Sequence, residues 1–298
     1  MADLSEFVHE LGQHILEGMY NGLYSVCNKL WTTMFDGLNN NITRSSQTLM
    51  QTPETWSSNA YGTVKNIAET AFVPLAACFI ACILAWELVH LLQESNQMGG
   101  QIFEKLIILL FTCVICVFLC SKSFEIVMWF FRLGAEVTGN MAGTTAGTFG
   151  DGLTLDQFLP QPENGEYELS MVFELLGDLI LLGIGNLVIL AIGVIIYVRV
   201  AMWFLEFLIY ASAASIPNAT WMNREWSQVG MNYTRKMLAV AFEGPFMLLL
   251  FAIYGGVVSG IGTGDFKQAF IMIIGCGFGL AMMMFKVGNI TASIFNAH

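Results

Sequence analysis

The side chains in this sequence that could do metal or acid–base chemistry are a few acids and histidines in or beside long apolar runs. Glu87 and His90 are three residues apart near the end of one such run, so they would share one face of a helix. A di-iron site needs two E-x-x-H pairs and two further glutamates, all facing one core. A second pair, Glu6 and His9, lies in an acidic amphipathic segment. We therefore predict no metal site and no cofactor, and expect Glu87 to mark the point where a helix leaves the membrane.

Glu243 is an acid inside another apolar run, directly before Gly244 and Pro245. At the helical rise it would lie about 9 Å below Met237. An ionisable group at that depth suggests a functional site. The alternative is that Glu243 stays protonated, or pairs with a polar group exposed where Pro245 breaks the backbone hydrogen bonds. The sequence leaves both open.

Arg199 and Glu206 lie two turns apart on one face of the preceding apolar stretch. We favour the interpretation that these two residues form ion pairs with a neighbouring helix over the interpretation that they are catalytic. The sequence contains no Walker loop and no G-x-S-x-G motif. We predict that the protein is not an enzyme.

The seven cysteines do not change this prediction, because six of them lie inside apolar runs. Cys113 and Cys116 have C-x-x-C spacing and form one helical stripe with Cys120. No partner C-x-x-C and no redox-fold pattern accompany them. We interpret them as small apolar packing residues.

The composition indicates a membrane protein. Of 298 residues, 55% are hydrophobic and 12% are charged, whereas soluble domains carry about 25% charged residues. The net charge of −11 argues against a basic surface for DNA or anionic lipid. The acidic N-terminus is not typical of a signal peptide, so we expect the first spanning helix to direct insertion.

The apolar runs predict an all-α polytopic fold with five or six spanning helices, because about 20 apolar residues cross a bilayer. Residues 199–216 either form a sixth span after a hairpin at Arg199 or continue the preceding helix along the membrane surface. The other runs are residues 71–92, 102–120, 179–198, 237–260 and 267–287.

The remaining segments connect or flank these runs. Residues 3–38 predict an amphipathic helix, and residues 39–60 a polar loop. A short amphipathic piece at 124–133 opens a glycine-rich acidic loop. We divide the chain into an N-terminal helix and polar loop, the first two spans, this acidic loop, and the C-terminal helices with a cytoplasmic segment at 217–236. The boundaries of these parts are 1–70, 71–120, 121–172 and 173–298.

Two further sets of residues are candidates for contacts with partners. Residues 217–236 predict either a helix that docks a partner or a plain topological anchor, since tryptophans and basic residues gather there. Small residues spaced for close helix packing predict an oligomer or partner interface. The first set is Arg224, Glu225, Trp226, Tyr233, Arg235 and Lys236, and the second is Gly256, Gly260, Gly275 and Gly279.

Three stretches carry a family resemblance. They are NREWSQVGMNYTRKMLAVAFEGPFMLL (223–249), RVAMWFLEFLIYASAASIP (199–217) and QTPETWSSNAYGTVKNIAETAFVPLA (51–76). Together they resemble the TrbL-type polytopic membrane subunits of conjugative type IV secretion systems, most closely those of integrative elements in Gram-positive gut bacteria. The resemblance covers most of residues 47–290.

The resemblance implies a channel or platform subunit in the bacterial cytoplasmic membrane. Such a subunit would assemble with other secretion membrane subunits, and separate ATPases would drive single-stranded DNA with its bound relaxase across the membrane. It also implies that residues 121–172 are extracytoplasmic, which favours five spans with the N-terminus outside. The positive-inside rule modestly favours six.

One alternative function comes from the residues alone. A secondary transporter could be built around Glu243 and Pro245. Transporters usually show internal repeats with matching broken helices, and nothing in the first half of the sequence mirrors FEGPF.

Overall fold

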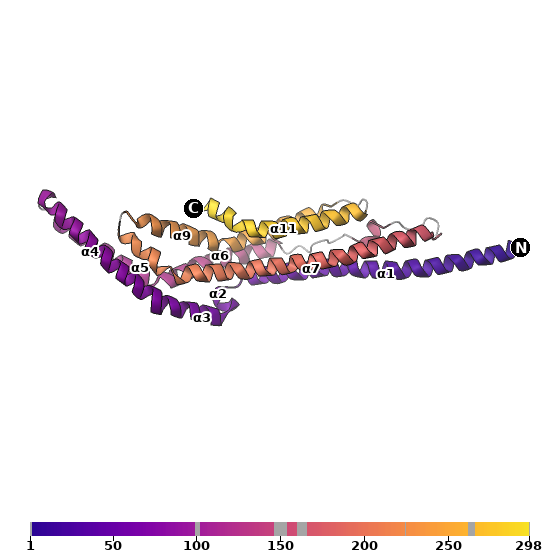
Figure 1. Cartoon of the computed structure of the whole chain (residues 1–298), viewed down its shortest axis with the longest axis horizontal. Coiled ribbons are helices and arrows are strands. Elements are labelled where there is room, and N and C mark those ends of the chain that lie inside the picture. Colours follow the sequence, from indigo (N-terminus) through magenta and orange to yellow (C-terminus); the bar gives the residue numbers. More distant parts are fainter. Residues whose placement is uncertain are drawn as a thin grey trace. The chain divides into compact units, whose positions relative to one another are not determined.

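The computed structural model describes residues 2–98, 102–145, 154–159, 166–223, 225–261 and 266–297, and these ranges are helical with no strand. The all-α prediction is confirmed. The elements (Figure 1) are α1 (Ala2–Leu49), α2 (Pro53–Trp56), α3 (Ser58–Ile67), a π-helical stretch η1 (Ala68–Phe72), α4 (Val73–Met98), α5 (Ile102–Ser121), α6 (Ser123–Thr145), a 3-10 turn η3 (Leu155–Gln157), α7 (Leu169–Ser212), α8 (Ser215–Ala219), a 3-10 turn η5 (Thr220–Met222), α9 (Ser227–Ala241), α10 (Glu243–Ser259) and α11 (Phe266–Ile294).

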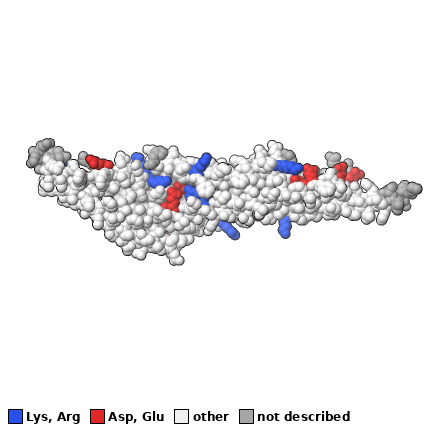
Figure 2. Space-filling model, in the orientation of Figure 1, with Lys and Arg blue, Asp and Glu red and all other residues white. Residues whose placement is uncertain are grey.

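Five helical stretches of the described chain are long and apolar enough to cross a membrane. On the face drawn in Figure 2, charged side chains form only small, separate patches. The protein is a multi-pass membrane protein, as predicted. The five stretches are Ser58–Gln93, Ile102–Ser121, Leu169–Met222, Ser227–Ser259 and Phe266–Ile294.

The alternative of a hairpin at Arg199 is wrong, because α7 passes through this residue without a turn. Its 44 residues would span roughly 66 Å. Between Gly193 and Pro217 the sequence contains no glycine and no proline. Nothing around Arg199 therefore interrupts the backbone hydrogen bonds of the helix. Residues 199–212 continue the third span instead of forming a sixth.

The predicted loop at 39–60 is also largely helical, since α1 continues to Leu49. Ile42, Ser45 and Leu49 are buried and fall three to four residues apart on one helical face. The polar residues between them occupy the exposed face, so a polar composition did not end the helix. Thr52 then caps α2 with a capping box.

The piece expected at 124–133 is the first part of a longer helix, α6, of 23 residues. It reaches Thr145 despite Gly134 and Gly139, because its buried face continues through Ala135 and Thr138. Most of the remaining acidic loop lies outside the described residues.

The chain forms two compact units, each assembled from segments distant in sequence. Unit 1 contains Met1–Ser46, Thr144–Val198 and Leu249–Met284, and unit 2 contains Gln47–Gly143, Arg199–Leu248 and Phe285–His298.

In unit 1, α1 packs against α7 through side-chain to backbone hydrogen bonds. The Cys27 thiol donates to the carbonyl of Leu175 at 3.8 Å, and Asn186 Nδ2 donates to the carbonyl of Leu30 at 3.0 Å. The ring of Trp31 lies 5.6 Å from that of Phe158. The amphipathic N-terminal helix therefore buries part of its apolar face within its own chain.

In unit 2, α4 and α5 lie side by side and enclose a core with α8 and η5. Cys116 and Cys120 are buried in this core, and Cys113 packs against it. The Cys120 thiol donates to the carbonyl of Ser215 at 3.3 Å. This agrees with the interpretation of these cysteines as packing residues.

A second core in unit 2 is aromatic and joins α2, α6 and α7. The ring of Phe131 lies 4.9 Å from that of Trp203 and 4.4 Å from that of Phe207. Trp56 stacks on Phe204 at 4.7 Å. This cluster fixes the part of α7 that carries the buried arginine described next.

Candidate functional site

The buried polar site in unit 2 begins at a break between two helices. α9 ends at Ala241, Phe242 interrupts the helix, and Glu243 is the first residue of α10. Pro245 falls in the first turn of α10, where a missing backbone N–H has no helical partner to lose. The sequence Glu-Gly-Pro thus begins a new helix and leaves Glu243 at its N-terminus.

Glu243 forms a buried ion pair with Arg199 of α7. Arg199 Nη2 donates to Glu243 Oε2 at 2.7 Å, and the two residues are 6% and 1% exposed. A Cβ at Gly288 of α11 would lie 2.8 Å from Glu243 Oε1. Glycine at this position leaves the carboxylate the room it occupies.

The arrangement matches one negative with one positive charge in an apolar region. Removing water from either charge alone costs several kcal/mol. The structure brings together two residues that the sequence singled out separately. Glu206, the third, is half-buried on α7.

The break itself is packed against two neighbours that sequence reasoning missed. Trp203 Nε1 donates to the carbonyl of Val240 at 2.7 Å, a backbone group left without its helical partner by the break. Gly134 of α6 lies so close to the carbonyl of Ala241 that a Cβ there would overlap it. A tryptophan and a glycine within helical runs were the only sequence indications.

Part of the predicted partner segment folds around Asn223. The backbone amides of Glu225 and Trp226 donate to Asn223 Oδ1 at 2.8 and 3.1 Å, and both side chains are exposed. Arg224 lies outside the described residues.

The rest of this segment is tied to the end of α7. The Tyr233 hydroxyl donates to the carbonyl of Tyr210 at 2.7 Å, and Lys236 Nζ lies 6.0 Å from the Tyr210 ring centroid. Arg235 Nη2 contacts Met231 Sδ at 3.6 Å. Tyr233 and Lys236 therefore help to hold α9 in place.

The four glycines singled out for packing make little contact within the chain. A Cβ at Gly256, Gly275 or Gly279 would meet nothing within 4 Å, and one at Gly260 would meet only carbonyls of its own helix. Gly277, which is not one of the four, is the buried glycine between Gly275 and Gly279 and lies beside Ile192 and Tyr254. The surface around the four glycines is open to lipid or to another chain.

The E-x-x-H motif at Glu87 is held by a residue distant in sequence. Asn223 Nδ2 donates to Glu87 Oε1 at 2.9 Å, and the His90 ring lies 5.2 Å from that of Trp86. The Glu6 side chain is outside the described part of the structure. No group of three or more His, Cys, Asp or Glu side chains that could hold a metal occurs among the described residues.

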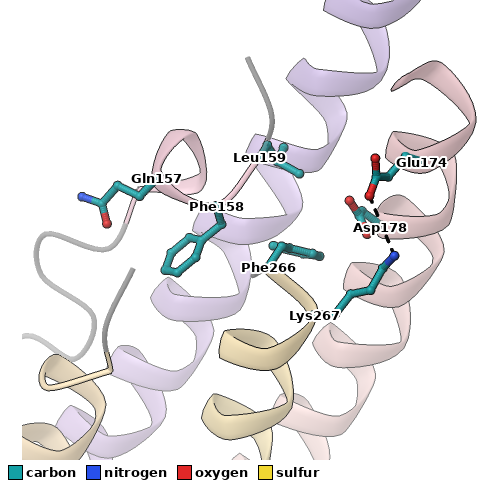
Figure 3. A pocket seen from close by; sticks show the side chains of 7 residues that line it. All are labelled: Gln157, Phe158, Leu159, Glu174, Asp178, Phe266 and Lys267. Carbon is teal, nitrogen blue, oxygen red and sulfur yellow. Dashed lines mark ion pairs between the residues drawn. The ribbon is translucent and has the colours of Figure 1, made fainter. Parts of the chain in front are cut away.

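Unit 1 contains a cavity of about 370 Å³ with both acidic and basic lining (Figure 3). Lys267 Nζ lies 3.9 Å from Glu174 Oε1, and Asp178, one turn after Glu174, is 3% exposed. Gln157 and Phe158 approach from the other side. The cavity lining thus includes two acidic side chains and one basic side chain, and an ion pair joins Lys267 to Glu174.

Cys27 is the cysteine that lies outside the candidate spans. Burial raises the pKa of its thiol to about 11, and the negative charge of Asp178 acts in the same direction. The thiol is therefore neutral at physiological pH.

A family model described as "TrbL/VirB6 plasmid conjugal transfer like protein" matches residues 38–215, which is more than half of the chain. No curated protein and no solved structure matches.

Proposed function

Because the chain belongs to the TrbL/VirB6 plasmid conjugal transfer-like family, we propose that it is a channel or platform subunit of a conjugative type IV secretion apparatus. It helps to move single-stranded DNA and its bound relaxase across the bacterial cytoplasmic membrane. It works with other membrane subunits and with separate ATPases, and has no catalytic residues of its own. The Gram-positive integrative elements are the proposed source.

The family match is the observation that carries this proposal. It includes α4, α5 and all of α7, so it covers two of the five candidate spans and most of a third, rather than a short motif. Family members are typically non-enzymatic secretion subunits.

The buried ion pair does not favour the transporter alternative. A coupling carboxylate must be able to lose and regain its cation or proton. Glu243 is held at 2.7 Å by an arginine, which stays protonated in proteins. A fixed structural role is the simpler account of this pair.

One contact supports an orientation with the N-terminus outside and five spans. The Glu87–Asn223 hydrogen bond joins the end of α4 to residues 217–236, which we place in the cytoplasm. Five spans with the N-terminus outside put both segments on that side, whereas six spans with the N-terminus inside separate them.

The proposal is tested by deleting the gene in frame within its mobile element. Transfer to recipient cells should fall below detection, growth should be unchanged, and a copy supplied in trans should restore transfer. Nicking of the element's DNA should still occur in the deletion strain, because the relaxase acts before export. Transfer at the normal frequency would exclude the proposed function.

A further inference from the structure

Unit 2 contains a cavity of about 450 Å³ beside the connected ends of α4 and α5. Its third wall is formed by Met222 of η5 together with Asn223 and Glu225. Small-molecule sites in proteins have volumes of about 300–1,000 Å³. The cavity is therefore large enough for a headgroup-sized ligand.

One side of this cavity carries side chains of opposite charge. Glu87 of α4 and Lys105 of α5 line it together with Glu225. Asn223 is 5% exposed, and its amide nitrogen fixes the Glu87 carboxylate at 2.9 Å. Since Asn223 Oδ1 is held by two backbone amides, the orientation of its amide is fixed.

The other side of the cavity is apolar and continues along a helix that faces lipid. Ile108 and Leu109 line the cavity, and Phe111 and Ile115, which follow on α5, are 67% and 43% exposed. Only 6% of the most apolar window of α5 is buried within the chain. The face of α5 that carries Phe111 and Ile115 is therefore available to acyl chains.

We propose that this cavity binds one phospholipid whose headgroup carries both a phosphate and a primary ammonium. The ammonium donates to the Glu87 carboxylate, the phosphate pairs with Lys105, and an acyl chain follows the exposed face of α5. Glu87 and Lys105 both lie near the ends of apolar runs, at the level where headgroups occur. This inference goes beyond the proposed function and does not depend on it.

The charges in the cavity distinguish this lipid from its neighbours in a membrane. An anionic headgroup without an amine could pair its phosphate with Lys105, but it would offer no cation to the Glu87 and Glu225 carboxylates. A trimethylated amine has no N–H to donate to Glu87. In a lipid with a primary amine, the ammonium can donate to Glu87 while the phosphate of the same headgroup contacts Lys105.

The test measures lipid retention by the full-length protein in detergent, using native mass spectrometry after exchange into equal amounts of phosphatidylethanolamine and phosphatidylcholine. The wild type should retain one phosphatidylethanolamine in preference. Glu87→Gln keeps an oxygen for the Asn223 hydrogen bond but loses the charge, so retention of phosphatidylethanolamine should fall about tenfold or more. Lys105→Gln should lower retention of both lipids.

Matched controls are Lys122→Gln, between α5 and α6, and Glu125→Gln on α6. They remove the same charges from an exposed ion pair of 3.1 Å in the same unit, and should retain lipid as the wild type does. A wild type without preference, or a Glu87→Gln variant that retains phosphatidylethanolamine normally, would overturn the proposal. So would a photo-crosslinker at Ile108 that captures a polypeptide in place of lipid. None of these results depends on DNA transfer.

Discussion

Arg199 and Glu243 pair inside a region of the protein that is otherwise apolar. Each residue was singled out from the sequence, but their pairing was not predicted. They are 44 residues apart, and which helices pack together depends on side-chain shapes along their whole length. Three further residues could be recognised only from the packed structure. Gly288 leaves room for the Glu243 carboxylate, Gly134 lies close against the helix break, and Trp203 donates a hydrogen bond to it.

We predict that removing one partner of this pair destabilises unit 2 strongly. Arg199→Ala or Glu243→Ala leaves a buried charge without its counter-ion, at a cost of about 3–5 kcal/mol. Unfolding in detergent micelles followed by circular dichroism would measure this loss. Lys122→Ala, which breaks the exposed Lys122–Glu125 pair, should cost no more than about 1 kcal/mol.

The double variant Arg199→Met with Glu243→Leu separates pairing from packing. If the two charges stabilise mainly by offsetting each other, the double variant should recover most of the loss, because apolar replacements of buried pairs are often neutral. A double variant that loses as much stability as Arg199→Met and Glu243→Leu lose singly, added together, would contradict this account.

At the scale of the elements, hydropathy predicted where the spans lie but not where the helices end. All five apolar runs are helical, yet α7 extends beyond its run at both ends. α7 continues because its second half contains no helix-breaking residue. Residues 39–49 remain helical because about one side chain per turn is buried. The break at Phe242 is visible in the sequence only as Gly244 and Pro245, which permit a break without fixing its position.

The orientation of these elements is predicted to follow the five-span scheme. In a background with Cys78 and Cys82 replaced by Ala, a membrane-impermeant maleimide applied to intact cells should label Glu168→Cys. It should not label Gln93→Cys or Gln228→Cys until the cells are permeabilised. Labelling of Gln93→Cys in intact cells would contradict the scheme, because this residue follows the first span.

For the molecule as a whole, the surface left open by the chain suggests assembly. Gly275 and Gly279 lie four residues apart on α11 with nothing packed against them, and the neighbouring Phe278 and Met282 are 45% and 66% exposed. Small residues at this spacing allow two membrane helices to approach closely. We propose that this face contacts another copy of the chain.

Replacing Gly275 and Gly279 together by Leu should therefore reduce crosslinked oligomers in native membranes and lower DNA transfer, while the protein still accumulates. Gly139→Leu is the control, since Gly139 is also exposed with nothing within 4 Å. Unchanged crosslinking in the double variant would show that this face meets lipid only.

The burial of the Cys27 thiol affects whether the protein can remain unmodified in an oxidising environment. In the proposed orientation the part of α1 around Cys27, which contacts the start of α7, lies on the side of the membrane where oxidants convert accessible thiols into disulfides or sulfenic acids. Oxidants react with the thiolate form of cysteine. Because the Cys27 thiol has a pKa of about 11 and no exposed surface, almost no thiolate is present for oxidants to reach. The protein can thus carry a reduced thiol into an oxidising space without a disulfide partner and without being modified there.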